Sequence, residues 1–170
     1  QAEMDSPPIQ KSPPCSFYSG TKALAEDAIA GVGRSYVWRL RIPFDEFDNA
    51  RNYLSKVQRY KKVYENVNSI SHRGDFVRAC LDLWEARAPL GTYNVTNPGF
   101  ITTRQVVQMI ERILKPNRTF EFWADDGEFY RLAAKTPRSN CVMDPRKLLS
   151  TGVRIRPVEE ALEHAMTHWK

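Results

Sequence analysis

The chain has 170 residues, of which 42% are hydrophobic and 26% are charged, and its formal net charge is +5. These values predict one soluble globular domain of ordinary size. No apolar run reaches the roughly 18 residues of a transmembrane helix, so we expect no membrane partner. The basic residues are spread along the chain and do not form a stripe, which disfavours nucleic acid as a partner.

The three cysteines, Cys15, Cys80 and Cys141, are odd in number and lack the spacing of metal ligands. We therefore expect free thiols, no metal site and a cytoplasmic location. The lack of a signal-peptide pattern at the start agrees with this expectation.

Residues 1–14 are polar and rich in proline, which predicts an extended loop. A helix is expected next, with Ser16 as its N-cap and Gly31 or Gly33 at its end. Its expected buried face consists of Ala23, Leu24, Ala28 and Ile29.

Tyr18 and Lys22 stand four residues apart in this predicted helix and so share one face. A nearby ammonium group favours the phenolate, so Lys22 would lower the pKa of Tyr18 from its reference value of about 10. A phenol tuned in this way can donate a proton to a carbonyl oxygen or accept one from an alcohol. The alternative is a surface Tyr and Lys that have this spacing by chance.

Residues 35–41 predict a buried strand of a parallel sheet, which Pro43 ends. Arg39 and Arg41 alternate with apolar residues, so they lie either near the strand end or solvated at a strand edge. An acidic loop then leads to a helix that begins at residues 49–52, and residues 63–67 predict a short strand.

His72 precedes a helix that we expect from Asp75 to about Ala86. A structural role fits His72 better than that of a catalytic base, and Asp75 fits a first-turn residue that complements the helix dipole. The expected buried face of this helix consists of Val77, Cys80, Leu81 and Trp84.

The remaining chain predicts a strand at 92–96, a helix capped by Thr102, a short strand at 120–123 and a weakly helical stretch at 124–135. Asp144 is expected to cap a helix through Leu149. The last helix is expected at 158–169, with an apolar face of Ala161, Leu162, Ala165, Met166 and Trp169.

Four segments resemble the extended short-chain dehydrogenase/reductases of the NAD-dependent epimerase/dehydratase family, which act on nucleotide sugars. They are Y-S-G-T-K-A-L-A-E from Tyr18, R-L-R-I-P-F from Arg39, Y-N-V-T from Tyr93 and T-P-R-S-N-C-V-M-D from Thr136. Within the family, the resemblance is greatest to dTDP-4-dehydrorhamnose reductases and plant nucleotide-rhamnose epimerase/reductases.

The resemblance implies an α/β fold, namely the C-terminal part of a Rossmann-like doubly wound parallel sheet plus a small α/β substrate-binding domain. Residues 1–45 would hold the last elements of the dinucleotide-binding domain. Residues 46–170 would form the substrate-binding region, with helices that return to the sheet.

The resemblance also implies that NADPH or NADH reduces a nucleotide-linked 4-keto-6-deoxy sugar of the dTDP- or UDP-4-dehydrorhamnose type. Tyr18 would protonate the alkoxide, and Lys22 would hydrogen-bond the nicotinamide ribose. Arg41 and Pro43 are further candidates for cofactor contact. Candidates for substrate contact are Arg39, Asn49, Arg51 and Arg138, although Asn49 also fits a helix cap. A positive pocket for the diphosphate would account for the net charge.

The family also needs a glycine-rich turn between a strand and a helix to hold the cofactor pyrophosphate. None of the eight glycines has that spacing. The resemblance therefore covers only the C-terminal half of the family, and we expect this chain alone to be inactive. An epimerase or dehydratase of the same family and a non-catalytic sugar-nucleotide-binding module stay open as alternatives, as does a homodimer.

Overall fold

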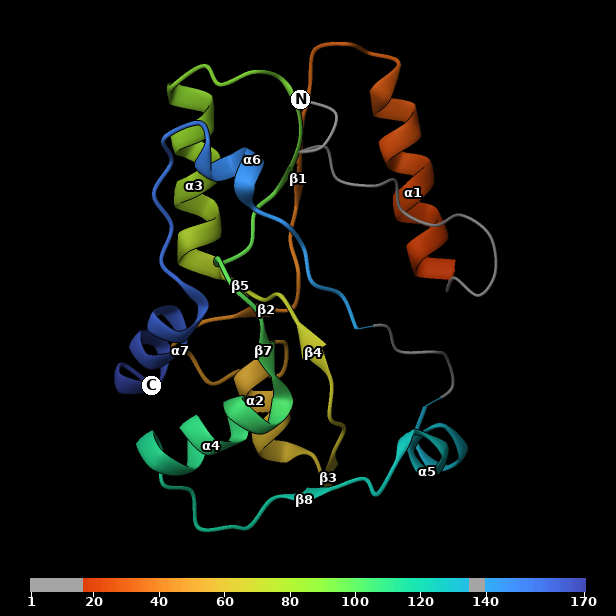
Figure 1. Cartoon of the computed structure of the whole chain (residues 1–170), viewed down its shortest axis with the longest axis vertical. Coiled ribbons are helices and arrows are strands. Elements are labelled where there is room, and N and C mark those ends of the chain that lie inside the picture. The colour runs from red at the N-terminus through yellow and green to blue at the C-terminus, as the bar shows by residue number, and fades with distance from the viewer. Residues whose placement is uncertain (1–16, 135–139) are drawn as a thin grey trace.

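The computed structural model describes residues 17–134 and 140–170 (Figure 1). The predicted loop at 1–14, the predicted cap Ser16 and the candidate Arg138 lie outside these residues. The helices are α1 (Phe17–Ala30), α2 (Tyr53–Arg59), α3 (Arg73–Glu85), α4 (Thr103–Ile113), α5 (Asp126–Leu132), α6 (Arg146–Leu149) and α7 (Val158–Thr167). The strands are β1 (Tyr36–Arg39), β2 (Pro43–Phe44), β3 (Lys62–Val63), β4 (Val67–Asn68), β5 (Ser71–His72), β6 (Gly91–Asn94), β7 (Ile101–Thr102) and β8 (Glu121–Phe122).

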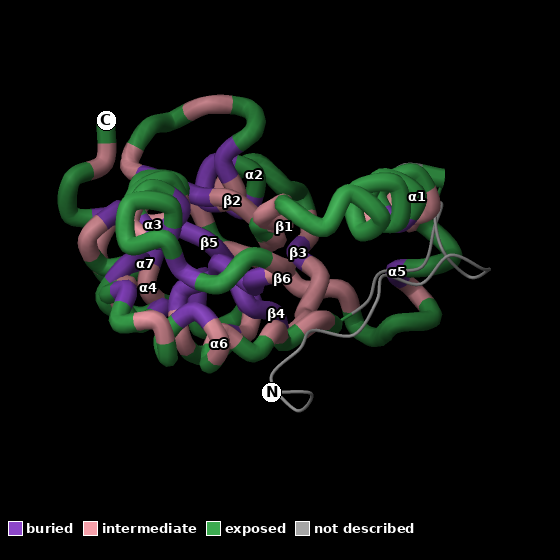
Figure 2. The backbone as a smooth tube through the Cα atoms, turned by 90° about the horizontal axis from the view of Figure 1, so that it is seen from above, coloured by how far each residue is buried: buried purple, intermediate pink, exposed green. Residues whose placement is uncertain are grey.

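The longest strand pair is β1 with β6, which run parallel in register from Tyr36 opposite Gly91 to Arg39 opposite Asn94. β2 pairs with β5 and β3 with β8, both in parallel, whereas β4 and β7 are antiparallel. In both views, α1 lies on one side of β1 and β6 and α3 lies on the other (Figures 1 and 2). Parallel strands with helices on both sides confirm the predicted α/β class.

The buried side chains form two clusters. One cluster joins α2, α4 and α7 around the short strands: Phe44, Leu54, Val57, Val63, Ile70, Ile101, Val106, Val107, Ile110, Val158, Ala161, Leu162, Ala165 and Met166. The other packs α3 and α6 against β6: Ala79, Cys80, Leu83, Ala88, Tyr93, Val95, Leu148 and Val153. The predicted domain boundary between residues 45 and 46 stays a prediction.

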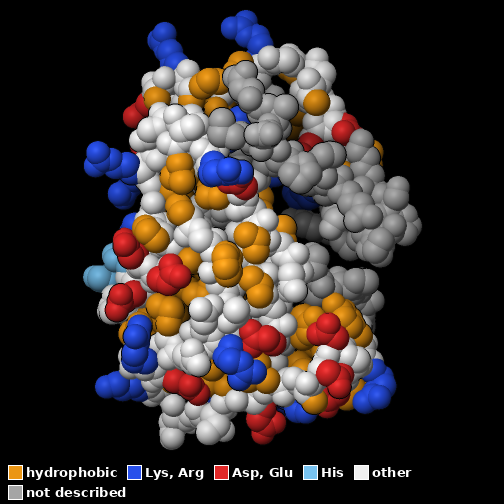
Figure 3. Space-filling model, in the orientation of Figure 1, with side chains coloured by type: hydrophobic (Ala, Val, Ile, Leu, Met, Phe, Trp, Pro, Cys, Tyr) orange, Lys and Arg blue, Asp and Glu red, His pale blue; other side chains and the backbone are white. Residues whose placement is uncertain are grey.

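Two predicted helix faces are wrong except for one residue each, Cys80 on α3 and Ala23 on α1. On α3 the exposed stripe is Val77, Leu81 and Trp84, the last with 64% of its surface exposed, and the buried residues are Ala79, Cys80 and Leu83. Ala79 and Cys80 pack in one cluster with Tyr93 of β6, and because their side chains are small, this face of α3 is the one that packs against the sheet. On α1, Ala23 is buried while Leu24, Ala28 and Ile29 are exposed. Hydrophobic side chains, drawn in orange, are also visible on the face of the molecule that Figure 3 shows.

Several predicted element ends also move. The strand predicted at 35–41 ends at Arg39, and Pro43 begins the separate strand β2 instead of only ending β1. The predicted strand at 63–67 is two strands, β3 and β4. α2 begins at Tyr53, because its N-cap is Asn52, whose side chain accepts from the Leu54 amide. Asp144 stands one residue before the cap position of α6 but still accepts from the Arg146 amide at 2.9 Å.

Other local predictions are confirmed. Thr102 caps α4 through a reciprocal capping box with Gln105. Ala161, Leu162, Ala165 and Met166 of the predicted last-helix face are buried in α7, whereas that helix ends at Thr167 and Trp169 beyond it is only partly buried. None of the helices in the described ranges is long and apolar enough to cross a membrane.

Candidate functional site

Tyr18 and Lys22 both lie in α1, as predicted. Lys22 is exposed, and the side chain of Tyr18 lies outside what the structure describes. Because four residues make about one helical turn, both side chains start from the same face of α1. α1 runs antiparallel to β1, so its first turn lies level with the carboxyl end of that strand (Figure 1). The lowered pKa of Tyr18 stays a prediction.

Arg39, the last residue of β1, is paired with Glu26 of α1. Its Nε donates to Oε1 at 2.9 Å, and its Nη2 donates to Oε2 at 2.6 Å. The two side chains are 12% and 22% exposed, so this two-bond pair is largely shielded from water. It links the helix that carries Tyr18 and Lys22 to the sheet. Substrate contact by Arg39 stays a prediction, now with a protein carboxylate as its observed partner.

Arg41 is held beside a second segment of the chain. Its Nη2 donates to Asn68 Oδ1 at 2.7 Å, and its backbone amide donates to Ser71 Oγ at 3.2 Å. The same Asn68 oxygen accepts from the Cys141 amide at 3.2 Å. The segment that begins at residue 140 therefore lies beside Arg41, and Arg138 precedes that segment in the chain.

The backbone turns sharply between Arg41 and Pro43. Ile42 has a φ of 40°, which is a strained value for a β-branched residue. Pro43 then pairs with Ser71 in β5. The strained turn lies on the short connection from β1 to β2, with Arg41 on that connection and Pro43 at the start of β2.

Asn49 and Arg51 lie elsewhere, in the loop before α2. Asn49 Oδ1 accepts from the amides of Arg51 and Asn52 at 3.0 and 3.1 Å, and its Nδ2 donates to the Phe47 carbonyl at 3.1 Å. Arg51 is exposed. Within the described ranges, no hydrogen bond or ion pair links these two side chains to α1 or Arg41. Their contact with substrate stays a prediction.

His72 has the structural role predicted for it. Its side chain is 5% exposed, its Nδ1 accepts from the Asp75 amide at 3.2 Å as the N-cap of α3, and its Nε2 lies 3.2 Å from Glu46 Oε2. Burial of Glu46 opposes ionisation, but hydrogen bonds from its own backbone and from His72 outweigh burial and lower the pKa of Glu46. Both ring nitrogens of His72 are thus engaged within the protein.

Three residues at this site were missed by sequence reasoning: Glu26, Asn68 and Ser71. Glu26 had a signal, because it follows Lys22 by one helical turn on the same face. Asn68 and Ser71 had none, since their partners are distant in sequence. Among the described residues, no group of three or more His, Cys, Asp or Glu side chains could hold a metal ion.

No protein-family model matches the chain. It is 28% identical over 148 residues to a bifunctional dTDP-4-dehydrorhamnose 3,5-epimerase/dTDP-4-dehydrorhamnose reductase of Arabidopsis thaliana, covering 86% of this chain and 48% of that protein. It is equally identical, over the same length, to the trifunctional UDP-glucose 4,6-dehydratase/UDP-4-keto-6-deoxy-D-glucose 3,5-epimerase/UDP-4-keto-L-rhamnose-reductase RHM1 of Arabidopsis thaliana, covering 22% of it. The chain thus spans about half the length, or less, of these curated relatives.

Solved structures share the fold. The L780 UDP-rhamnose synthase of Acanthamoeba polyphaga mimivirus superposes with a TM-score of 0.79 at 23% identity, over 92% of this chain and 55% of that one. A dTDP-4-dehydrorhamnose reductase of Bacillus anthracis in complex with NADP has a TM-score of 0.71 at 14% identity, over 95% and 57%. MoeE5 in complex with UDP-glucose and NAD has a TM-score of 0.65 at 17% identity, over 88% and 54%. The predicted Rossmann-like fold class and the resemblance read from the sequence are confirmed.

Proposed function

We propose that this chain is the proton-donating and substrate-facing part of an NAD(P)H-dependent reductase that acts on a nucleotide-linked 4-keto-6-deoxy sugar. The observation that carries the proposal is the pair Tyr18 and Lys22 in the first turns of α1, level with the carboxyl end of the parallel strands β1 and β6. In open α/β sheets, ligands bind at the carboxyl ends of the strands. The hydroxyl of Tyr18 suits proton donation to a sugar alkoxide, and the ammonium of Lys22 suits hydrogen bonds to a ribose.

The residues present fit the nicotinamide end of the cofactor. Lys22 is exposed on α1 and can donate to ribose hydroxyls, Arg41 lies on the connection that follows β1, and Pro43 begins β2. The pyrophosphate end has no glycine-rich turn among the 170 residues. The cofactor therefore needs a further glycine-rich part, which the relatives' greater length accommodates.

The chemistry divides between cofactor and protein. When bound, the nicotinamide supplies the hydride for the carbonyl carbon. Tyr18 holds a proton on its phenol oxygen and delivers it to the alkoxide oxygen, and the ammonium of Lys22 stabilises the phenolate that remains. Arg41, oriented by Asn68, offers a planar guanidinium to the diphosphate.

The names of the two plant relatives support a rhamnose-type substrate, since both include reduction of a 4-keto rhamnose nucleotide. One relative is named for dTDP and the other for UDP, so the proposal covers both nucleotides. We also propose that the enzyme is soluble and cytoplasmic and that it does not bind nucleic acid.

Steady-state kinetics of Tyr18→Phe in the complete enzyme tests the function. We expect turnover with NADPH and a 4-keto sugar nucleotide to fall by about 10²–10⁴-fold, the usual worth of one proton transfer. Binding of the sugar nucleotide should persist. Tyr60→Phe is the matched control, because Tyr60 is exposed at the end of α2.

Unchanged turnover in Tyr18→Phe would remove Tyr18 from the reaction. Deuterium uptake from D₂O at C3 or C5 of the sugar, without oxidation of NADPH, would instead favour the epimerase alternative. Tight binding of the sugar nucleotide without any turnover by the unmodified enzyme would favour the non-catalytic module.

A further inference from the structure

The ion pair between Arg39 and Glu26 is more than a surface contact. Both carboxylate oxygens of Glu26 accept from the guanidinium, at 2.9 and 2.6 Å, and both side chains are at least three-quarters buried. Such two-bond pairs between arginine and carboxylate are the stronger and more geometrically specific kind. The carboxylate of Glu26 is therefore held in one direction, toward β1.

The position of Glu26 along α1 makes that direction matter. Tyr18, Lys22 and Glu26 follow one another at intervals of four residues, so their side chains start from the same face on successive turns. Lysine and glutamate at this spacing attract each other. A Glu26 carboxylate released from Arg39 would compete with the phenol of Tyr18 for the ammonium of Lys22.

We propose that Arg39 is a positioning residue that holds the Glu26 carboxylate away from Lys22 and so reserves the Lys22 ammonium for Tyr18. This inference rests on the proposed function and adds a role that the substrate-binding interpretation of Arg39 lacks. Its rival is a plain structural link between α1 and β1. The two differ in what happens when both charges are removed together.

The test uses Arg39→Met, Glu26→Gln and the double variant in the complete enzyme. The direct readout is the tyrosinate absorbance titration of each protein minus that of the same protein with Tyr18→Phe, which isolates Tyr18 and needs no substrate. We expect Arg39→Met to raise the Tyr18 midpoint by about one pH unit, because a neighbouring opposite charge typically shifts a pKa by 1–3 units. Turnover at pH 7 should fall about tenfold.

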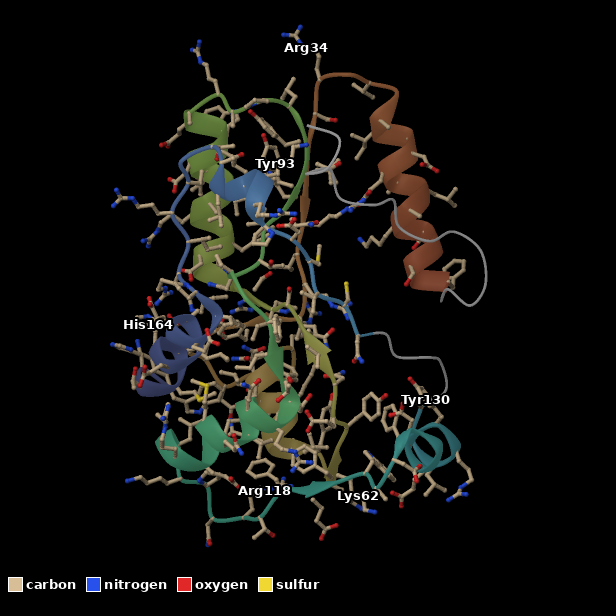
Figure 4. The ribbon with its side chains drawn as sticks, in the orientation of Figure 1. Arg34, Lys62, Tyr93, Arg118, Tyr130 and His164 are labelled. Atoms are coloured by element: carbon tan, nitrogen blue, oxygen red, sulfur yellow. The ribbon has the colours of Figure 1, made fainter. Side chains whose placement is uncertain are left out.

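In the double variant, both the Tyr18 midpoint and the turnover should return close to those of the unmodified enzyme, because the competing carboxylate is gone. Glu26→Gln alone should not raise the midpoint. Any contact of Arg39 with the substrate diphosphate would appear separately, as a raised KM that Glu26→Gln leaves uncorrected. Arg34→Met is the matched control, since Arg34 points away from the molecule beyond the end of α1 (Figure 4).

Equal impairment of Arg39→Met and the double variant, or an unshifted midpoint in Arg39→Met, would overturn the proposal in favour of the structural link. If Arg39→Met does not fold, Arg39→Lys decides the matter. Arg39→Lys keeps a cation at Glu26 and should hold the midpoint near its original value, and a midpoint raised by one unit would overturn the proposal. An enzyme without reductase activity would defeat the proposed function, whereas the titration would still judge Arg39.

Discussion

Replacing Asp75 by asparagine would weaken the hydrogen bonds that join three parts of the chain. Asp75 lies in the first turn of α3 and accepts from Arg156 Nη2 at 2.7 Å, from Arg156 Nε at 3.0 Å and from Asn97 Nδ2 at 2.9 Å. The Asp75 side chain is 11% exposed and that of Arg156 is 31% exposed. The carboxylate thus ties α3 to the turn after β6 and to the segment before α7.

The expected loss is about 2–3 kcal/mol of the free energy of unfolding at pH 7. Hydrogen bonds to charged groups are worth about 1.5–3 kcal/mol, and breaking a fully buried ion pair costs about 3–5 kcal/mol. The lower range applies, because Arg156 is partly exposed and can be rehydrated when its partner becomes neutral.

The loss should depend on pH. Burial alone would raise the pKa of Asp75, but the neighbouring His72 ring and the hydrogen bonds from Arg156 and Asn97 outweigh it and hold that pKa well below its usual value. Because the pKa is lower in the folded state, the carboxylate stabilises the fold above pH ~4 and loses this effect as the pH falls further. The difference in the free energy of unfolding between the unmodified protein and Asp75→Asn should therefore become smaller toward pH 3.

Urea denaturation followed by tryptophan fluorescence at pH 7, 5 and 3 measures this difference. Glu85→Gln, at the exposed end of the same helix, is the control and should change stability by less than about 0.5 kcal/mol, as surface substitutions usually do. A gap for Asp75→Asn that is equally large at pH 7 and pH 3 would refute the reasoning, as would equal losses in both variants.

Two further predictions concern ligands. Arg41→Ala and Arg138→Ala in the complete enzyme should raise the KM for the sugar nucleotide more than they lower turnover, because the diphosphate is bound alike in the ground and transition states. Unchanged KM values together with tight binding of labelled oligonucleotides at physiological salt would contradict this. Calorimetry of residues 1–170 alone should show NADPH binding far weaker than in the complete enzyme, since the pyrophosphate turn is missing. Micromolar affinity would disprove it.

The sequence by itself determined the features that depend on neighbours along the chain. Thr102 and Gln105 form their capping box because both partners lie within one helical turn. The apolar residues of 158–166 are spaced so that they form one continuous stripe on a helix, and α7 buries that stripe. The four-residue spacing of Tyr18 and Lys22 likewise required only a helix, which α1 supplies.

The tertiary structure decided what depends on groups far apart in sequence. α3 has two apolar stripes, and only packing against β6 selects Ala79, Cys80 and Leu83 over Val77, Leu81 and Trp84. The sequence could not predict the hydrogen-bond partners of Arg39 and Arg41 for the same reason. The sequence pattern of the strand shows which positions carry an arginine. Only folding brings the carboxylate of Glu26 to Arg39 and the amide of Asn68 to Arg41. Long polar side chains can pair with many groups, and only the packed chain selects one.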